Sequence, residues 1–400
     1  MKILVLSQYF YPENFLINDL VFSLKDRGHE VTVLTAKPNY SKTYFFEGYG
    51  WKSSDFESIQ GVPVYRSNLF SRRNGGALRL FLNYFSFALL ATLKLRKIKG
   101  PFDAIFVYEP SPITVGIPAV FAKKSFNAPI YFWAQDLWPE SLVAAGGVKN
   151  RFVLGFFNSL TKWIYSHCRK VLVQSPGFTD YILNQGVPKD KIVFYPNPTE
   201  AFYKPLENEN QYESFFSKDH FNIVFAGNIG EAQSFKTIID VISNIKSLPV
   251  KVTVLGDGRY KETAFSLIKE KRLEANFNFL GSFPPTEMPK FFSHADALLV
   301  SLKKDKIFSL TIPAKIQSYL ACGKPIIASI DGIGAQVVKK AECGVTAAAE
   351  SVEELEAAIK HLIALDSDKR DLMAKNARTY YEKEFDRELL LEKLEKILIS

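Results

Sequence analysis

The sequence predicts an α/β protein of two doubly wound domains, each with a parallel sheet between layers of helices. Short apolar strands alternate with helical patterns along the chain, which is typical of parallel sheets covered on both faces. This alternation restarts halfway, and 400 residues are more than one ordinary core requires. We therefore expect two facing domains and a deep cleft between them, because ligands of such sheets collect at the carboxyl ends of strands.

The first half has the spacing of a β-α-β fold. An apolar strand at 3–6 precedes a helical pattern over 16–24 and a strand at 30–35. Further strands are expected at 104–108, 130–133 and 171–174, with helices between them.

The same pattern returns after Asn197-Pro198. Strands are expected at 222–226, 252–255, 278–280, 297–301 and 325–329. Pro196, Pro198 and Pro205 interrupt the pattern between the halves. We expect a first domain over 1–203, a second over 204–378, and a C-terminal helix over 379–400 that packs back on the first domain.

Charge and cysteine content narrow the class of protein. The net charge of +8 comes from the first half, most densely from 51–100, and suits phosphates of nucleic acid or of an anionic membrane and its lipid-linked substrates. Three widely spaced cysteines form no Cys/His cluster, which favours reduced thiols over a zinc site. The apolar stretch at 3–6 is too short for a signal-peptide core, so we expect a cytoplasmic protein.

Residues 78–99 interrupt the α/β pattern with an apolar run edged by Arg79, Lys94, Arg96, Lys97 and Lys99. The run is shorter than a bilayer span needs. It is either a buried helix or an interfacial helix on a membrane, and the flanking basic residues favour the interface. Residues 151–170 carry several aromatic side chains and form either a second part of that surface or an ordinary core helix.

Two segments of the first half are candidate binding sites. The loop over 7–15 leads into a helix N-terminus, where backbone N–H groups suit a diphosphate. Asp136 and Glu140 follow a predicted strand, and their carboxylates could orient substrate hydroxyls or a leaving group. Helix capping by Asp136 is an equally simple interpretation.

In the second half, glycine turns at 227–230 and 256–258 let a ligand approach the backbone closely. The strongest stretch is 303–325, a basic loop followed by a helix that begins near Pro313 and ends at Gly323. Its lysines at 303, 304, 306 and 315 surround a helix start, as a pyrophosphate requires. The alternative is a solvated lysine loop before an ordinary helix.

These stretches together resemble glycosyltransferase family 4, over essentially the whole chain. The resemblance rests on the opening loop and on the motifs at 27–35, 196–198, 256–258, 281–283, 313–315 and 319–325. The phrases at 11–15, 135–140, 227–230 and 312–317 resemble a subgroup of O-antigen and capsule enzymes, including transferases assigned to N-acetyl-L-fucosamine.

The resemblance implies the GT-B architecture of two facing Rossmann-like domains and metal-independent, retaining transfer from a UDP-sugar to a polyprenyl-diphosphate-linked saccharide. It implies no cofactor, no nucleic-acid partner, and a peripheral location on the inner face of the cell membrane. The implied catalytic residues are Asp136, Glu140 and Lys315. The implied donor-binding residues are Asn14, Phe15, Asn228, Gln233, Gly256, Asp257, Gly258, Phe283, Lys303, Lys306, Thr311, Ile312, Pro313, Ala314 and Ser318.

The chain departs from the family pattern at two places. The family's usual glutamate pair, whose second member holds the donor ribose, falls on Leu310 and Ser318. Its usual Arg and Lys after the first strand of the second domain fall on Asn228 and Gln233, so the lysines over 303–315 must neutralise the diphosphate. A nucleotide-sugar epimerase of the same architecture and a non-catalytic assembly scaffold remain alternatives, and nucleic-acid binding explains less of the sequence.

Overall fold

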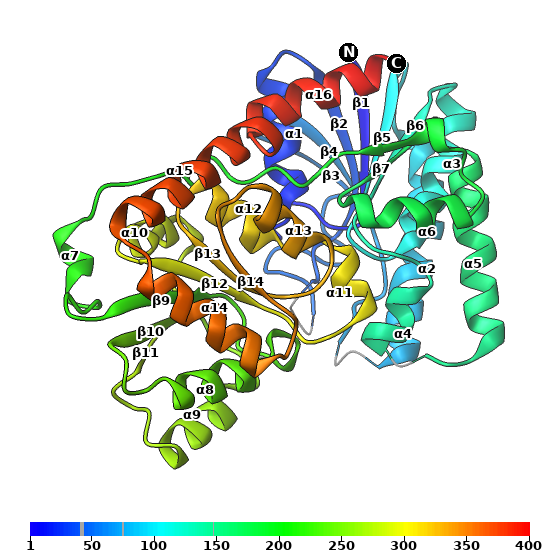
Figure 1. Ribbon diagram of the computed structural model, residues 1–400. Coiled ribbons are helices and arrows are strands. Elements are labelled where there is room, and N and C mark those ends of the chain that lie inside the picture. Colours follow the sequence, from blue (N-terminus) through cyan, green and yellow to red (C-terminus); the bar gives the residue numbers. More distant parts are fainter. Residues whose placement is uncertain (41–43, 74–75, 147) are drawn as a thin grey trace. The chain divides into compact units, whose positions relative to one another are not determined.

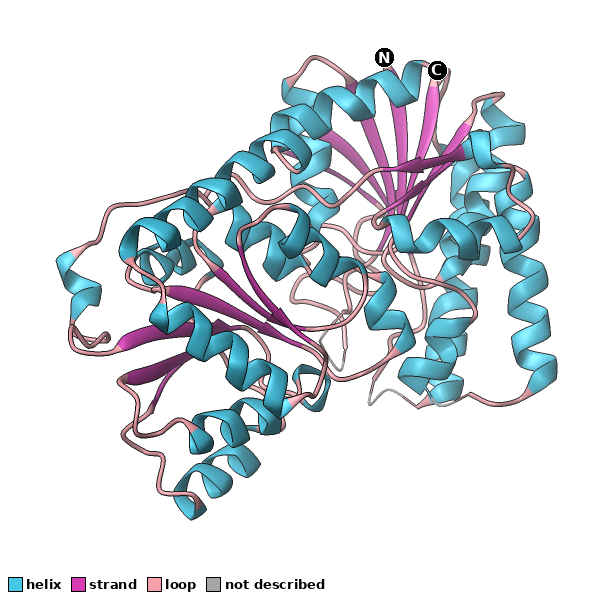
Figure 2. Ribbon diagram, viewed as in Figure 1, coloured by secondary structure: helices cyan, strands magenta, loops and turns pink. Residues whose placement is uncertain are grey.

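The computed structural model describes residues 1–40, 44–73, 76–146 and 148–400. The chain forms two compact units, Met1–Pro196 with Leu390–Ser400, and Asn197–Leu389. The expected division was after residues 203 and 378, so the connector over 197–203 and all of α15 belong to unit 2. Each unit contains one sheet with helices on both faces (Figures 1 and 2).

Unit 1 contains an eight-stranded sheet in the order β3-β4-β2-β1-β5-β6-β7-β8. Neighbouring strands are parallel, except that β3 is antiparallel to β4. The strands are β1 (Lys2–Ser7), β2 (Glu30–Ala36), β3 (Phe56–Ile59), β4 (Val62–Ser67), β5 (Ala104–Glu109), β6 (Ile130–Ala134), β7 (Lys170–Val173) and β8 (Ile192–Phe194). The order reverses between β1 and β5, so their carboxyl ends form a topological switch point.

The helices of unit 1 connect these strands and cover the sheet (Figure 2). They are α1 (Leu16–Asp26), α2 (Ala77–Lys94), α3 (Gly116–Phe126), α4 (Glu140–Gly146), α5 (Arg151–Ser166), α6 (Thr179–Asn184) and most of α16 (Arg387–Ile399). Leu390 and Leu394 of α16 are buried in the core with Ile3 and Val5 of β1. The Glu395 carboxylate accepts hydrogen bonds from Arg27. The chain therefore ends on the unit in which it begins, and Met1 and Ser400 line the same cavity.

Unit 2 contains a six-stranded parallel sheet in the order β11-β10-β9-β12-β13-β14. The strands are β9 (Phe221–Ala226), β10 (Val250–Leu255), β11 (Phe277–Gly281), β12 (Ala297–Ser301), β13 (Ile326–Ser329) and β14 (Gly344–Ala347). The helices are α7 (Asn210–Glu213), α8 (Phe235–Asn244), α9 (Lys261–Glu270), α10 (Met288–Ser293), α11 (Lys306–Leu310), α12 (Ala314–Ala321), α13 (Ile333–Lys340), α14 (Val352–Ala364) and α15 (Ser367–Glu384).

The predicted α/β fold class is confirmed, and the expected strands are present. Four strands were not predicted: β3, β8 and β14, which lie at sheet edges, and β4, which pairs with the edge strand β3. The expected basic loop after β12 contains α11, because the Asp305 carboxylate caps this helix by accepting from the N–H groups of Ile307 and Phe308.

Candidate active site

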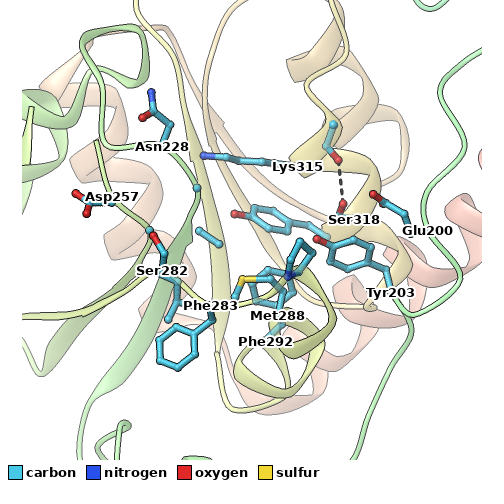
Figure 3. Close-up of a pocket in the computed structure, with 17 residues that line it drawn as sticks. Glu200, Tyr203, Asn228, Asp257, Ser282, Phe283, Met288, Phe292, Lys315 and Ser318 are labelled. Atoms are coloured by element: carbon cyan, nitrogen blue, oxygen red, sulfur yellow. Dashed lines mark hydrogen bonds between the residues drawn. The ribbon is translucent and has the colours of Figure 1, made fainter. Parts of the chain in front are cut away.

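Unit 2 has a cavity of about 470 Å³ at the carboxyl ends of its strands (Figure 3). Its walls come from the loops after β9, β10 and β11, from α10 and α12, and from the connector before α7. The lining residues are Glu200, Tyr203, Ala226, Gly227, Asn228, Leu255, Gly256, Asp257, Ser282, Phe283, Pro285, Met288, Phe292, Ala314, Lys315, Ser318 and Tyr319. This is the place where doubly wound sheets bind ligands.

Lys315 is the cation in the wall of this cavity. Its Nζ lies 4.2 Å from the centre of the Phe225 ring. Desolvation by burial lowers the pKa of Lys315 to about 8. No carboxylate or hydrogen-bond acceptor pairs with this ammonium among the residues that the structure describes. A poorly hydrated, unpaired cation in a cavity favours an anionic ligand.

The backbone at the start of α12 adds to this positive potential. Pro313 has φ −59° and ψ 132° and precedes the first helical residue, Ala314, so the unpaired N–H groups of the first turn lie beside Lys315. Pro313 was expected within the first helical turn, and it is instead the residue before it. The helix start and the lysine together suit a diphosphate.

The opposite side of the cavity is polar and acidic. Figure 3 shows Lys315 extending toward Asn228, whereas Glu200 and Tyr203 lie on the other side, beside Ser318. The Ser318 hydroxyl donates to the Ala314 carbonyl at 3.2 Å and is also hydrogen-bonded with the Tyr203 side chain. The Lys315 ammonium and the Asp257 carboxylate therefore lie toward one side of the cavity, and the Glu200 carboxylate lies at the other.

Glycines at the strand ends serve backbone packing. A Cβ on Gly256, which has φ +141°, would lie 2.0 Å from the Gly227 carbonyl oxygen, and a Cβ on Gly258 would lie 2.3 Å from that of Ile229. The loops after β9 and β10 thus pack directly on each other. We had expected these glycines to give a ligand access to the backbone, whereas the atoms that require glycine belong to the neighbouring loop.

Six of the predicted donor-binding residues line the cavity, together with the predicted catalytic residue Lys315: Asn228, Gly256, Asp257, Phe283, Ala314 and Ser318. Gly258, Gln233, Lys303, Lys306, Thr311, Ile312 and Pro313 are not among its lining residues. Lys303 and Lys306 are exposed. The Gln233 side chain accepts a hydrogen bond from the Asn228 amide, the Thr311 hydroxyl donates to the Phe308 carbonyl, and Ile312 is buried. Lys303 and Lys306 thus do not line this cavity, and their role in donor binding stays a prediction.

The cavity is also lined by residues that were not predicted from the sequence: Glu200, Tyr203, Met288, Phe292 and Tyr319. Glu200 and Tyr203 follow the Pro-Asn-Pro motif at 196–198, which was noted without a role. The three others lie on helices whose apolar faces are indistinguishable from core in the sequence.

The predicted residues of unit 1 lie near the carboxyl ends of its strands. The Asp136 carboxylate, after β6, accepts from the Ser141 hydroxyl at 2.5 Å and from the Leu137 N–H at 3.2 Å, and burial raises its pKa. The Glu140 carboxylate accepts a hydrogen bond from the Tyr181 hydroxyl. Both carboxylates thus have structural partners, as the capping interpretation of Asp136 allowed.

The loop after β1 holds the other two predicted residues. Asn14 is exposed, and Phe15 is the residue before α1, so their N–H groups precede the helix. The Phe15 ring stacks on Tyr9 with 4.8 Å between centroids.

Glu109 at the end of β5 is a further buried carboxyl group, which the sequence analysis did not single out. It is fully buried, and burial and the nearby Asp136 raise its pKa. The described residues contain no group of three or more His, Cys, Asp or Glu side chains that could hold a metal ion.

Two α/β units, the second with a lysine-bearing cavity at its strand ends, fit the GT-B architecture, and the family models show the class to be glycosyltransferase. Two family models match the chain, "Glycosyl transferase 4-like domain" over residues 16–198 and "Glycosyl transferases group 1" over 207–380. The chain belongs to glycosyltransferase family 4, as the motifs indicated.

Individual relatives agree with this class. The chain is 24% identical over 416 residues to the putative colanic acid biosynthesis glycosyl transferase WcaI of Escherichia coli K12, covering 98% of both chains. Anabaena HepE in complex with UDP has a TM-score of 0.73 at 15% identity, covering 100% of this chain and 99% of that one. Sucrose-phosphate synthase from Thermosynechococcus elongatus has a TM-score of 0.76 at 16% identity, covering 99% and 98%. The similarity to these two solved structures shows that the chain shares their fold.

Proposed function

We propose that this glycosyltransferase transfers a sugar from a UDP-sugar to a polyprenyl-diphosphate-linked saccharide during synthesis of a bacterial surface polysaccharide, with retention at the anomeric carbon and without a metal. The observation that carries the proposal is the unpaired Lys315 ammonium in the cavity of unit 2. The UDP bound to HepE and the name of WcaI support a nucleotide-sugar donor and a polysaccharide product. An N-acetylated deoxyhexose such as N-acetyl-L-fucosamine is the proposed sugar, on the basis of the subgroup motifs.

The donor diphosphate binds Lys315 and the first N–H groups of α12. As the bond between the sugar C1 and the β-phosphate oxygen breaks, that oxygen keeps the electron pair, and the charge develops where the lysine and the helix start already point. The acceptor hydroxyl attacks C1 from the same face, and its proton passes to the leaving phosphate. Lysine thereby supplies the charge that a divalent cation provides in other transferases.

Glu200 supplies the carboxylate that position 318 lacks. It comes from the connector and lines the cavity beside Ser318 (Figure 3). A carboxylate accepts both O–H groups of a ribose diol, and bonds to a charged acceptor are stronger than bonds to a hydroxyl. Placed across the cavity from Lys315, it fits a ligand with a diphosphate at one end and a ribose at the other.

Unit 1 has an exposed apolar surface that suits a lipid-linked acceptor. On α2, Leu78 and Leu89 are 71% and 62% exposed, and Phe152 and Phe156 of α5 are 91% and 53% exposed. The rings of Phe85 and Phe156 lie 6.1 Å apart, so the two helices form one continuous surface. Apolar faces of this kind bind at the interface of a membrane.

The other face of α2 belongs to the protein core. By length and composition, Leu78–Lys97 could cross a membrane. However, Asn83 is buried and donates to Asn39 Oδ1 and to the Phe70 carbonyl, and Phe87 is fully buried. A helix with one face in the core and one face exposed supports a peripheral location on the inner face of the cell membrane.

The proposal is tested by incubating the purified chain with isotopically labelled UDP-sugars and membranes that contain lipid-linked saccharides, in the presence of EDTA. We expect label in the lipid-extractable product from one UDP-sugar, with an unchanged anomeric configuration by NMR. Release of free sugar would indicate an epimerase or hydrolase, and UDP binding without turnover would indicate the scaffold.

A further inference from the structure

Arg72 of unit 1 lies among three tyrosine rings. Its guanidinium carbon is 5.2 Å from the ring centre of Tyr9, 5.0 Å from that of Tyr40 and 5.5 Å from that of Tyr84. One guanidinium nitrogen donates to the Tyr9 hydroxyl, and the Nε is buried without an acceptor. No carboxylate pairs with Arg72 in the part of the chain that the structure describes.

Arg66, in the same unit, is an arginine with a structural role and can be compared with Arg72. It also lies over a tyrosine ring, that of Tyr49, at 4.8 Å. Each of its three guanidinium nitrogens has a partner, because it pairs with Glu57 and donates to the carbonyls of Ala36 and Tyr11. Arg66 has a counterion inside the protein, whereas Arg72 retains donors and a charge for a ligand.

The tyrosines around Arg72 lie on elements that meet at the carboxyl edge of the sheet. Tyr9 follows β1, which borders the switch point, Tyr40 follows β2, and Tyr84 belongs to α2. Buried amides hold these elements together: Gln8 donates to Asn83, and Asn83 donates to Asn39. Burial raises the pKa of Tyr9, so its hydroxyl stays neutral and accepts from Arg72. The arginine is thus positioned in advance, on the side of the sheet where ligands bind.

Two neighbours of Tyr84 indicate what the ligand is. Its ring faces Trp138 at 6.5 Å between centroids, and Trp138 lies two residues after Asp136. One helical turn before Tyr84, Phe81 is 48% exposed and belongs to the apolar surface of α2. Arg72 therefore lies between Asp136, which was predicted to orient substrate hydroxyls, and the exposed apolar surface of α2, which suits a lipid.

We propose that Arg72 binds the phosphate groups of the polyprenyl-diphosphate acceptor, with the lipid along α2 and the first sugar toward Asp136. A guanidinium fork matches phosphate oxygens bidentately, and the surrounding rings strengthen this contact by excluding water. The inference rests on the proposed function and assigns the acceptor's anionic group to one side chain.

The test measures binding of the full chain to three vesicle types by sedimentation: phosphatidylcholine alone, with polyprenyl diphosphate, and with phosphatidylglycerol at equal charge. We expect the wild type to prefer polyprenyl diphosphate, and Arg72→Gln to lose about tenfold or more of that preference, as removal of a charged hydrogen-bonding pair implies. Arg73→Gln, which removes the same charge from an exposed neighbour, should keep it. Inorganic pyrophosphate should compete weakly, because it lacks the lipid.

Arg72→Lys keeps the charge without the fork and should retain part of the preference, which guards against a folding defect in the glutamine variant. Stabilisation of each variant by UDP reports on unit 2 separately, so loss of acceptor binding with intact UDP binding supports Arg72 alone. Equal effects of Arg72→Gln and Arg73→Gln, or equal wild-type binding to both anionic vesicles, would overturn the inference. Full competition by pyrophosphate would mean a site for free phosphate.

Discussion

The Lys315 ammonium lies 4.2 Å from the centre of the Phe225 ring, so a charged group from α12 lies against a core residue near the carboxyl end of β9. The contact is a cation–π interaction, which partly offsets the loss of water around the lysine. It also holds the side chain pointed into the cavity, beside Gly227.

The depressed pKa of Lys315 predicts a pH dependence of donor binding. The free lysine loses its proton near pH 8, whereas a bound diphosphate favours the charged form and raises the pKa in the complex. UDP affinity should therefore be constant from pH 7 toward 8 and fall by up to about tenfold per pH unit above it. Calorimetric titration checks this slope. Lys315→Arg, which stays charged, should remove it, and a wild-type affinity that stays flat to pH 9.5 would argue against a role for the lysine charge.

Glu200→Gln should weaken UDP binding by about tenfold, because the ribose loses a charged acceptor. Adding Ser318→Glu should restore the affinity by returning a carboxylate to the same region of the cavity. The matched control is Glu207→Gln, an exposed residue of the segment between this connector and α7. Binding of 2′-deoxy-UDP should respond less to each change. If UDP and 2′-deoxy-UDP lost equal affinity, Glu200 would not contact the ribose.

Gly256→Ala should destabilise unit 2 by more than about 2 kcal/mol, because the new methyl group would overlap the Gly227 carbonyl. Thermal unfolding of the variant measures the loss. Gly281→Ala separates backbone strain from overlap, since Gly281 has φ +80° but no atom within 4 Å of its Cβ position. Gly281→Ala should lower the free energy of unfolding by about 1 kcal/mol. An equal loss in Gly256→Ala would show that the loop moves to relieve the overlap with the Gly227 carbonyl.

Much of the fold was predictable because buried parallel strands are nearly continuous apolar runs, as in β5 and β9. The start of α12 was predictable to within one residue from the Pro313 motif, and this motif also drew attention to Lys315, which lines the cavity. The sequence shows several lysines near this helix start but not which of them lines the cavity. The orientation of α12 determines that Lys315 does, whereas Lys303 and Lys306 do not. Glu200 and the tyrosines around Arg72 come together through contacts distant in sequence, which one sequence does not reveal.

The double variant Phe152→Ser, Phe156→Ser should bind anionic vesicles at least about tenfold more weakly than the wild type, because two large apolar side chains no longer enter the interface. The melting temperature should hardly change, since both side chains are exposed. Leu372→Ser on α15 is the control, as its 57% exposed side chain lies on unit 2. Unchanged vesicle binding of the double variant would remove α5 from the proposed membrane surface.

The most direct test of the central claim is calorimetric titration of UDP into the wild type and Lys315→Ala in EDTA, with Lys303→Ala and Lys306→Ala alongside. The account predicts that the wild type binds, that the two exposed lysines contribute little, and that Lys315→Ala loses about a hundredfold or more in affinity while melting no lower than the wild type, because a buried charge has been removed. Wild-type affinity in Lys315→Ala, or no UDP binding by the wild type, would contradict the assignment of the cavity as the donor site.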